Sequence, residues 1–105
     1  MADQERLIYG LAEHHYADFA HIFKRYPKIE RVLIFGSRAK GTAKPYSDFD
    51  LAIMAPEMRD QEFNLLWNEL DEVPLVFKFD ILHWDTLVNQ PLKEKILQEG
   101  RIFYP

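Results

Sequence analysis

The chain has 105 residues, a formal net charge of −4 at pH 7 and no cysteine. This length suits one domain rather than two, and the lack of cysteine excludes disulfides, thiolate catalysis and cysteine-bound zinc. A dedicated DNA- or RNA-binding protein normally carries a basic surplus, because phosphate contacts supply much of its affinity, so direct DNA binding is not expected. No apolar run reaches the roughly 20 residues of a membrane span. The N-terminus lacks the basic start and apolar stretch of a signal peptide, so we expect a cytoplasmic location.

The first half of the chain predicts a helix, a strand and a loop. Asp3 is expected to cap a helix that continues to the region of Tyr26 on apolar residues at helical spacing and stops near Pro27. The apolar, β-branched run at residues 31–35 predicts a buried strand that ends at Gly36. Residues 36–47 are rich in Gly, Ser, Lys, Thr and Pro and predict a loop with one helical turn after Ser37.

The second half of the chain alternates strands and helices. Residues 48–54 and 75–82 predict strands. Apolar positions 63, 66, 67 and 70 predict an amphipathic helix between them. Residues 91–99 predict a last helix that ends at Gly100, and residues 101–104 a short edge strand. We therefore expect a single α/β domain over residues 1–105, with a small mixed sheet of three or four strands and helices packed on it.

Asp48 and Asp50 are the first candidates for chemistry. Residues i and i+2 of a strand project to the same face, about 6–7 Å apart at Cα. Two neighbouring carboxylates repel each other and lose hydration on burial, so a sequence selected for stability alone avoids them. A divalent cation relieves both costs, and Mg²⁺ prefers one or two carboxylates together with phosphate oxygens and water. The pair predicts a metal site.

Asp80 is the third candidate. It lies in a predicted strand between Phe79 and Ile81, where a carboxylate is unusual unless it has a partner. If this strand lies beside the strand that carries Asp48 and Asp50, Asp80 faces the pair. Three carboxylates around one or two metals suit the in-line displacement of a phosphoryl or nucleotidyl group.

A glycine-containing loop precedes the acids and predicts an anion site. Gly36 lets the backbone approach a ligand closely, since it has no Cβ. Ser37 contributes a hydroxyl, and a strand that ends in Gly-Ser before a helical turn presents backbone N–H groups to phosphate. Arg38 and Lys40 add positive charge in the same loop. We expect these four residues to bind a nucleotide.

Together these motifs resemble a known family. Gly36-Ser37, ten intervening residues and Asp48-Phe49-Asp50 resemble the signature of the DNA polymerase β nucleotidyltransferase superfamily. Residues 36–41, Gly-Ser-Arg-Ala-Lys-Gly, are similar to its minimal nucleotidyltransferase subfamily. The order of predicted elements fits that fold over essentially the whole chain. The resemblance implies that Asp48, Asp50 and Asp80 bind metal, that Asp80 assists deprotonation of the acceptor, and that the Gly-Ser pair holds the terminal phosphates of the nucleotide.

The resemblance also implies a biological role. Members of this subfamily are commonly encoded beside a HEPN-domain toxin, as its antitoxin. It implies a protein adenylyltransferase that uses ATP with Mg²⁺ or Mn²⁺, moves AMP to a tyrosine of the toxin and forms a hetero-oligomer with it. Two alternatives remain open. The chain could neutralise the toxin by masking it without catalysis, or it could modify a small molecule with a partner chain supplying the acceptor site.

Overall fold

Four strands form a mixed sheet at the centre of the structure. The structure is a computed structural model, and it describes residues 7–44, 47–75 and 78–105. The strands are β3 (Arg31–Phe35), β4 (Phe49–Met54), β5 (Phe79–His83) and β6 (Arg101–Tyr104), and their order across the sheet is β5-β4-β3-β6. β3 is antiparallel to β4 and β6, whereas β4 and β5 are parallel. The predicted small mixed sheet is confirmed.

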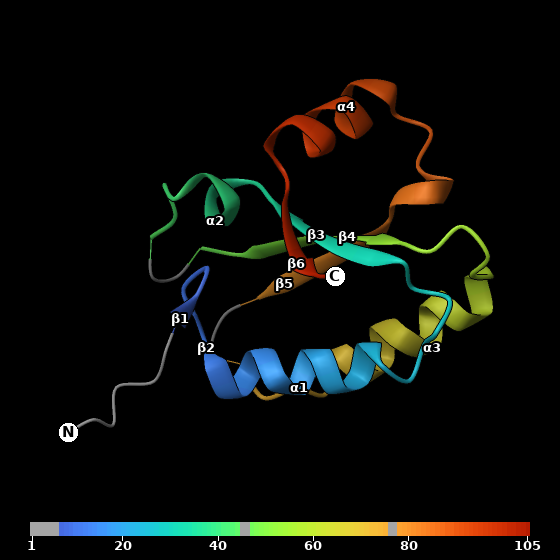
Figure 1. The fold of residues 1–105 in the computed structure, drawn as a ribbon, viewed down its shortest axis with the longest axis horizontal. Coiled ribbons are helices and arrows are strands. Elements are labelled where there is room, and N and C mark those ends of the chain that lie inside the picture. Colours follow the sequence, from blue (N-terminus) through green and yellow to red (C-terminus); the bar gives the residue numbers. More distant parts are fainter. Residues whose placement is uncertain (1–6, 45–46, 76–77) are drawn as a thin grey trace.

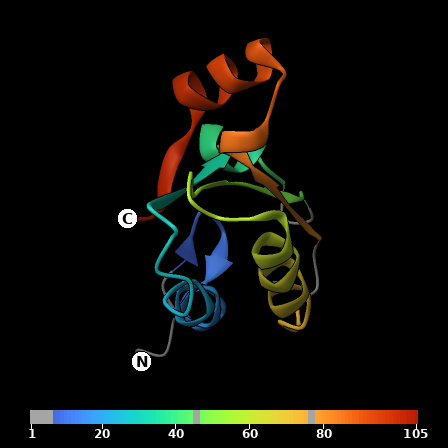
Figure 2. The same ribbon diagram turned by 90° about the vertical axis from the view of Figure 1, so that its right-hand side faces the viewer.

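Helices cover both faces of this sheet. α1 (Glu13–Phe23) and α3 (Asp60–Asp71) lie side by side on one face, and α4 (Gln90–Glu99) lies on the other (Figures 1 and 2). α3 connects β4 to β5, and a crossover helix of this kind allows two consecutive strands to run parallel. Two single turns lie between these elements: α2 (Ser37–Lys40) between β3 and β4, and the 3₁₀ turn η1 (Trp84–Thr86) after β5. The result is a three-layer α/β domain.

The alternation of side chains in β4 separates the core from the polar end of the strand. Phe49, Leu51 and Ile53 are at most 2% exposed and pack in the cluster that includes α1 and α3. Ala52 belongs to the smaller cluster under α4. Because successive residues of a strand point to opposite faces, Asp50 lies on the α4 side of the sheet with Ala52.

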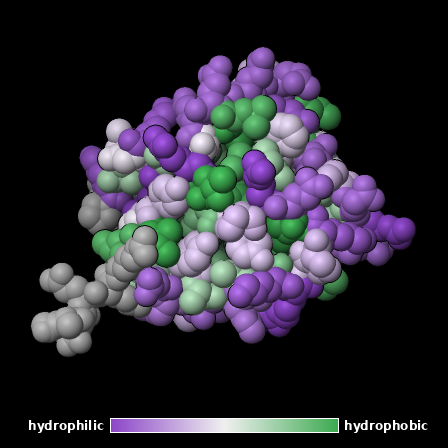
Figure 3. All heavy atoms as spheres, in the orientation of Figure 1, coloured by the Kyte–Doolittle hydropathy of each residue, from purple (hydrophilic) through white to green (hydrophobic). Residues whose placement is uncertain are grey.

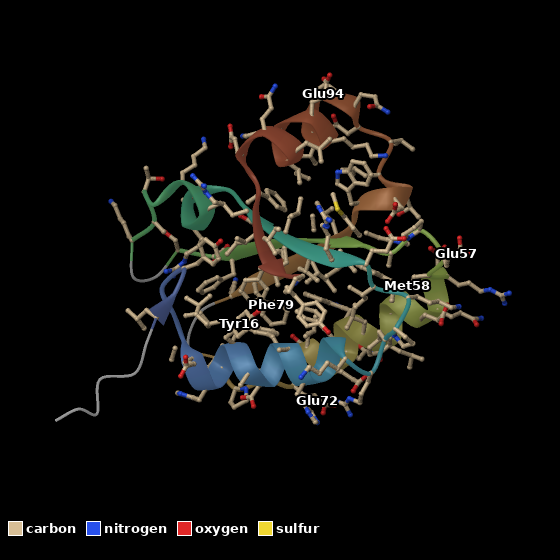
Figure 4. All side chains as sticks on the ribbon, in the orientation of Figure 1. Tyr16, Glu57, Met58, Glu72, Phe79 and Glu94 are labelled. Atoms are coloured by element: carbon tan, nitrogen blue, oxygen red, sulfur yellow. The ribbon has the colours of Figure 1, made fainter. Side chains whose placement is uncertain are left out.

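The strand next to β4 repeats this pattern. In Figure 4, Phe79 points from β5 into the layer between the sheet and the two helices, whereas Glu94 projects outward from α4. The Phe79 ring makes edge contacts with Phe19, at 5.3 Å between ring centroids, and with Trp67, at 5.5 Å. Asp80, the next residue, therefore lies on the face opposite to the aromatic core.

The N-terminal segment differs from the expected helix. Residues 7–12 form an antiparallel hairpin of β1 (Leu7–Ile8) and β2 (Leu11–Ala12), and α1 begins only at Glu13. The two turn residues, Tyr9 and Gly10, have φ of 55° and 85°. A two-residue turn with positive φ at both positions matches the twist of a hairpin, and Gly10 adopts it without steric cost. The expected cap at Asp3 lies outside the described residues.

Other boundaries shift less. β4 begins at Phe49, one residue after Asp48, and β5 is observed from Phe79, while part of the expected strand, residues 76–77, lies outside the described residues. α4 is capped by Asn89, whose side chain accepts a hydrogen bond from the Leu92 N–H. None of the helices in the described part of the chain has the length and apolar character needed to cross a membrane.

Candidate active site

Asp50 and Asp80 occupy paired positions on the neighbouring parallel strands β4 and β5. Strands in a sheet lie about 4.8 Å apart, and paired residues project to the same face. The strand adjacency on which the grouping of the three acids depends is therefore present. Asp48 directly precedes β4, so all three acids lie at the same end of the sheet, with Asp48 and Asp80 exposed and Asp50 half-buried.

The acids influence one another electrostatically. Burial raises the pKa of the Asp50 carboxyl above its ordinary value, and the nearby charges of Asp80 and Asp48 raise it further. Both effects disfavour the ionised form of Asp50. The structure thus places a partly desolvated carboxylate among like charges, an arrangement that costs free energy unless a positive charge joins it.

Gly36 brings the loop backbone directly against Asp50. The residue before it, Phe35, is paired with Asp50 across β3 and β4. Gly36 has φ of 78°, and a Cβ added to it would lie only 2.8 Å from Asp50 Oδ2. Positive φ and this close approach both require glycine. The loop is closed by two main-chain hydrogen bonds, from Lys40 N–H to the Gly36 carbonyl and from Thr42 N–H to the Ser37 carbonyl, each at 3.1 Å.

Ser37, the first residue of α2, is partly exposed beside this contact. The other two predicted nucleotide-binding residues already have protein partners. Lys40 Nζ lies 3.2 Å from Glu99 Oε1 at the end of α4, as an ion pair rather than a well-directed hydrogen bond. Arg38 is 7% exposed, and its guanidinium donates to main-chain carbonyl oxygens. Nucleotide contact by either side chain stays a prediction.

The carboxylates of the acid cluster are suitable ligands for a divalent cation, but the described side chains do not form a complete coordination shell. Among residues 7–44, 47–75 and 78–105, no three Asp, Glu or His side chains converge closely enough to hold one ion as they stand. Mg²⁺ commonly takes only one or two carboxylates and completes its shell with substrate phosphates and water. The hard oxygen donors of Asp48, Asp50 and Asp80 suit Mg²⁺ or Mn²⁺. Burial and then the neighbouring charges raise the pKa of Asp50, and such an ion would offset both costs.

Hollows lie beside α2 and beside Asp80. One, of about 390 Å³, is lined by Tyr9, Gly10 and residues of α2 and its following loop. Another, of about 360 Å³, borders Asp80 and is walled by α3 side chains such as Trp67. A wider open groove of about 860 Å³ lies away from the chemistry, between the hairpin, α1 and β6. On the face drawn in Figure 3, hydrophobic atoms gather toward the centre and lower left, inside a hydrophilic upper and right rim.

Sequence reasoning missed the residues that hold Arg38. Tyr9 and Ser47 supply its carbonyl partners, and they lie 29 and 9 positions away from it in the chain. Gly10 was the available signal, since a glycine that follows an aromatic residue between two short apolar pairs is compatible with a hairpin turn. Leu7 and Leu11 are spaced as on a helix, so the sequence favoured a helix over a hairpin in this segment.

Comparison with known proteins identifies the family. The family model described as "Polymerase beta, Nucleotidyltransferase" matches residues 18–105. A curated relative from Haemophilus influenzae, named "Probable protein adenylyltransferase MntA", is 45% identical over 56 residues, which are 52% of this chain and 49% of the relative. The matched segment therefore spans about half the length of that curated relative.

Two solved structures share the fold. A toxin–antitoxin crystal structure with AMP-PNP matches with a TM-score of 0.68 at 20% identity. The match covers 85% of this chain and 72% of the chain in that structure. A crystal structure of a mutant toxin–antitoxin MntA–HpeT has a TM-score of 0.65 at 15% identity, with 85% and 71% covered. The matched family model, which spans most of the chain and includes the Gly-Ser loop and all three acids, shows that the chain belongs to the polymerase beta nucleotidyltransferase family.

Proposed function

We propose that this chain is a metal-dependent protein adenylyltransferase and the antitoxin of a HEPN-domain toxin. The observation that carries the proposal is the meeting of three features at one end of the sheet. Asp50 and Asp80 are paired, Asp48 precedes them, and a Cβ at Gly36 would clash with the Asp50 carboxylate. The similarity to a protein named as a probable adenylyltransferase, over about half of each chain, supports ATP as the nucleotide donor.

In this proposal the chain binds and orients both reactants. The Gly36–Ser37 backbone and hydroxyl hold the terminal phosphates of ATP. Asp48, Asp50 and Asp80 would hold Mg²⁺ or Mn²⁺. The bound cation supplies electrostatic stabilisation of the phosphates and of the departing pyrophosphate. Asp80 accepts the proton of a tyrosine hydroxyl on the toxin. The tyrosine oxygen bonds to the α-phosphorus as the bond from that phosphorus to the pyrophosphate oxygen breaks.

Isotope position tests this reaction. The purified chain is incubated with its HEPN partner, Mg²⁺ and ATP labelled at either the α- or the γ-phosphate. We expect the partner to retain label from the α-position only, since AMP is transferred and the β- and γ-phosphates leave. Retention of γ-label instead would identify phosphoryl transfer, and no retention from either position would refute adenylylation. A cytoplasmic location belongs to the same proposal, because the reaction consumes cellular ATP.

Neutralisation by binding alone is the second candidate. The observation that favours it is apolar surface away from the acids: Leu7 is 65% exposed and Ile102 53% exposed, and both line the groove between the hairpin, α1 and β6. Exposed apolar patches often mark protein interfaces. A variant with Asp48→Asn and Asp50→Asn separates the two candidates in cells that carry the toxin. Loss of protection supports catalysis, whereas full protection supports masking.

A further inference from the structure

Arg38 is a buried cation next to the candidate site. It belongs to α2, yet only 7% of its surface is exposed, and burial lowers the pKa of its guanidinium below the ordinary value. A charged group is buried in this way only when its hydrogen-bonding groups are satisfied by the protein. Its partners therefore indicate what the side chain does.

Those partners lie on two other parts of the chain. Arg38 Nη2 and Nε donate to the Ser47 carbonyl oxygen at 2.8 and 3.2 Å. Nη1 reaches the Tyr9 carbonyl in the hairpin turn at 3.5 Å. The guanidinium carbon also lies 4.1 Å from the centroid of the Phe49 ring, within the range of a cation–π contact. One side chain thus links α2, the hairpin and the start of β4.

The two contacts near β4 enclose a predicted metal ligand. Ser47 and Phe49 are the residues on either side of Asp48, and Asp50 follows Phe49. The same loop also approaches Asp50 at Gly36, where a Cβ would lie 2.8 Å from the carboxylate. Residues 36–41 therefore contact the segment that carries Asp48 and Asp50 at two places. Arg38 binds the residues on either side of Asp48, and Gly36 lies close to Asp50.

Gly10 provides the space that this arrangement needs. A Cβ at Gly10 would lie 2.4 Å from Arg38 Nη1, and Gly10 has φ of 85°. Glycine at the hairpin turn therefore permits the guanidinium to approach the turn backbone. The hairpin also rests on the sheet, since the Tyr9 hydroxyl donates to the Ile102 carbonyl at 3.2 Å.

We propose that Arg38 is a positioning residue, which fixes Asp48 and Asp50 for metal binding by clamping Ser47 and Phe49, rather than a phosphate ligand. This inference rests on the proposed function for the identity of the metal ligands. It predicts a specific difference between arginine and lysine. Lysine keeps the charge but has a single ammonium, so it cannot form the forked contact with Ser47 or lie flat on Phe49. A phosphate ligand tolerates that exchange far better than a clamp does.

The test uses Mn²⁺ alone, without nucleotide, and amide hydrogen exchange of the same proteins. The variants are Arg38→Lys, Arg38→Met and Gly10→Ala, with Arg31→Met as the matched control because Arg31 is exposed at the opposite end of β3. The exchange probes are the Ser47 and Phe49 amides, which donate to the Lys44 and Lys78 carbonyls. Arg38→Lys, which keeps size and charge, provides the test if Arg38→Met does not fold.

We expect Arg38→Lys to weaken Mn²⁺ binding roughly 10- to 100-fold, as the loss of a residue that supports metal ligands typically does, and to accelerate exchange at both probe amides. Arg31→Met should match the wild type in both measurements. Unchanged exchange and unchanged Mn²⁺ affinity in Arg38→Lys would overturn the inference. A separate titration of the same variant with ATP would also overturn it if ATP binding is lost while Mn²⁺ binding stays intact, because that result identifies a phosphate ligand. If the wild type binds no Mn²⁺ while exchange still accelerates, the clamp stands and the metal site of the proposed function fails.

Discussion

The backbone of Gly36 approaches the carboxylate of Asp50 so closely that a side chain at position 36 would displace it. Asp50 Oδ2 lies 2.8 Å from the place where a Cβ would stand, and the φ of 78° is itself unfavourable for any side chain. This contact joins the end of β3 to the start of β4. It links the loop expected to bind phosphate with the acid expected to bind metal.

Gly36→Ala is predicted to damage transfer more than folding. Gly36 has φ of 78° and ψ of −156°, a conformation essentially confined to glycine, and holding another residue there costs about 1–3 kcal/mol. The added methyl group also displaces the Asp50 carboxylate. Displacement of a reacting group by about 1 Å can reduce turnover about 100-fold, and we expect a loss of that size in adenylyl transfer. Initial rates and a thermal melt of the same preparation measure the two effects. An alanine variant that transfers adenylate at the wild-type rate would show that the close approach of Gly36 to Asp50 does not affect catalysis.

Asp50→Asn is predicted to raise the melting temperature in metal-free buffer while abolishing transfer. Burial and the charges of Asp80 and Asp48 raise the pKa of Asp50, so its ionised form destabilises the fold at neutral pH. A neutral amide of the same shape removes that cost, the trade of stability against function that active sites often show. Calorimetry with EDTA present provides the measurement. A lower melting temperature in the variant would mean that Asp50 has a stabilising role that the cluster of acids does not explain.

Divalent metal is predicted to stabilise the wild type and not the acid variants. A ligand that binds only the folded state adds about 2.7 kcal/mol of stability when its concentration is 100 times Kd. Mg²⁺ should therefore raise the melting temperature of the wild type, with little effect on a variant carrying Asp48→Asn and Asp50→Asn. Equal shifts in both proteins would place the metal elsewhere. Glu94→Gln, an exposed acid on α4, is the matched control and should respond like the wild type.

Alkaline pH is predicted to weaken the hydrogen bond between Tyr26, in the loop after α1, and Glu69 of α3. The Tyr26 hydroxyl donates to Glu69 on α3, and burial together with that hydrogen bond raises the pKa of Tyr26 from 10.0 to about 12. The folded state therefore holds the phenolic proton more tightly than the unfolded chain. The resulting stability is fully present below pH 10 and is lost as the pH rises toward 12. Melting curves of the wild type and Tyr26→Phe from pH 9 to 12 should converge. A difference in melting temperature that stays the same from pH 9 to 12 would refute the stabilising role of the Tyr26 proton.

The position of the three acids at one end of the sheet was predictable because the signals are local. An acid between Phe79 and Ile81 needs a partner wherever the strand lies, and β5 pairs Asp80 with Asp50. The two-residue period of a strand placed Asp48 beside Asp50, but β4 begins only at Phe49. The hairpin was not predictable in this way. Leu7 and Leu11 are spaced as on a helix, but the positive φ of Tyr9 and Gly10 ends that possibility, and α1 begins at Glu13.

The environment of Arg38 was also beyond sequence reasoning. A basic residue next to a Gly-Ser loop has the same signature whether it faces phosphate or the protein interior. Its direction is decided by the carbonyl oxygens of Tyr9 and Ser47, which only the folded chain brings together. The ion pair of Lys40 with Glu99 likewise joins α2 to the end of α4, 59 positions later in the chain. Tertiary contacts, rather than local pattern, determine both side chains.

The most direct test of the central claim is the intact mass of the proposed HEPN-domain partner after incubation with this chain, ATP and Mg²⁺. The account predicts that the partner gains the mass of one adenylate on a tyrosine, located by fragmentation. It also predicts no gain with the variant carrying Asp48→Asn and Asp50→Asn, or with Asp80→Asn. An unmodified partner in the presence of the wild-type chain, under conditions in which the two proteins form a complex, would contradict it.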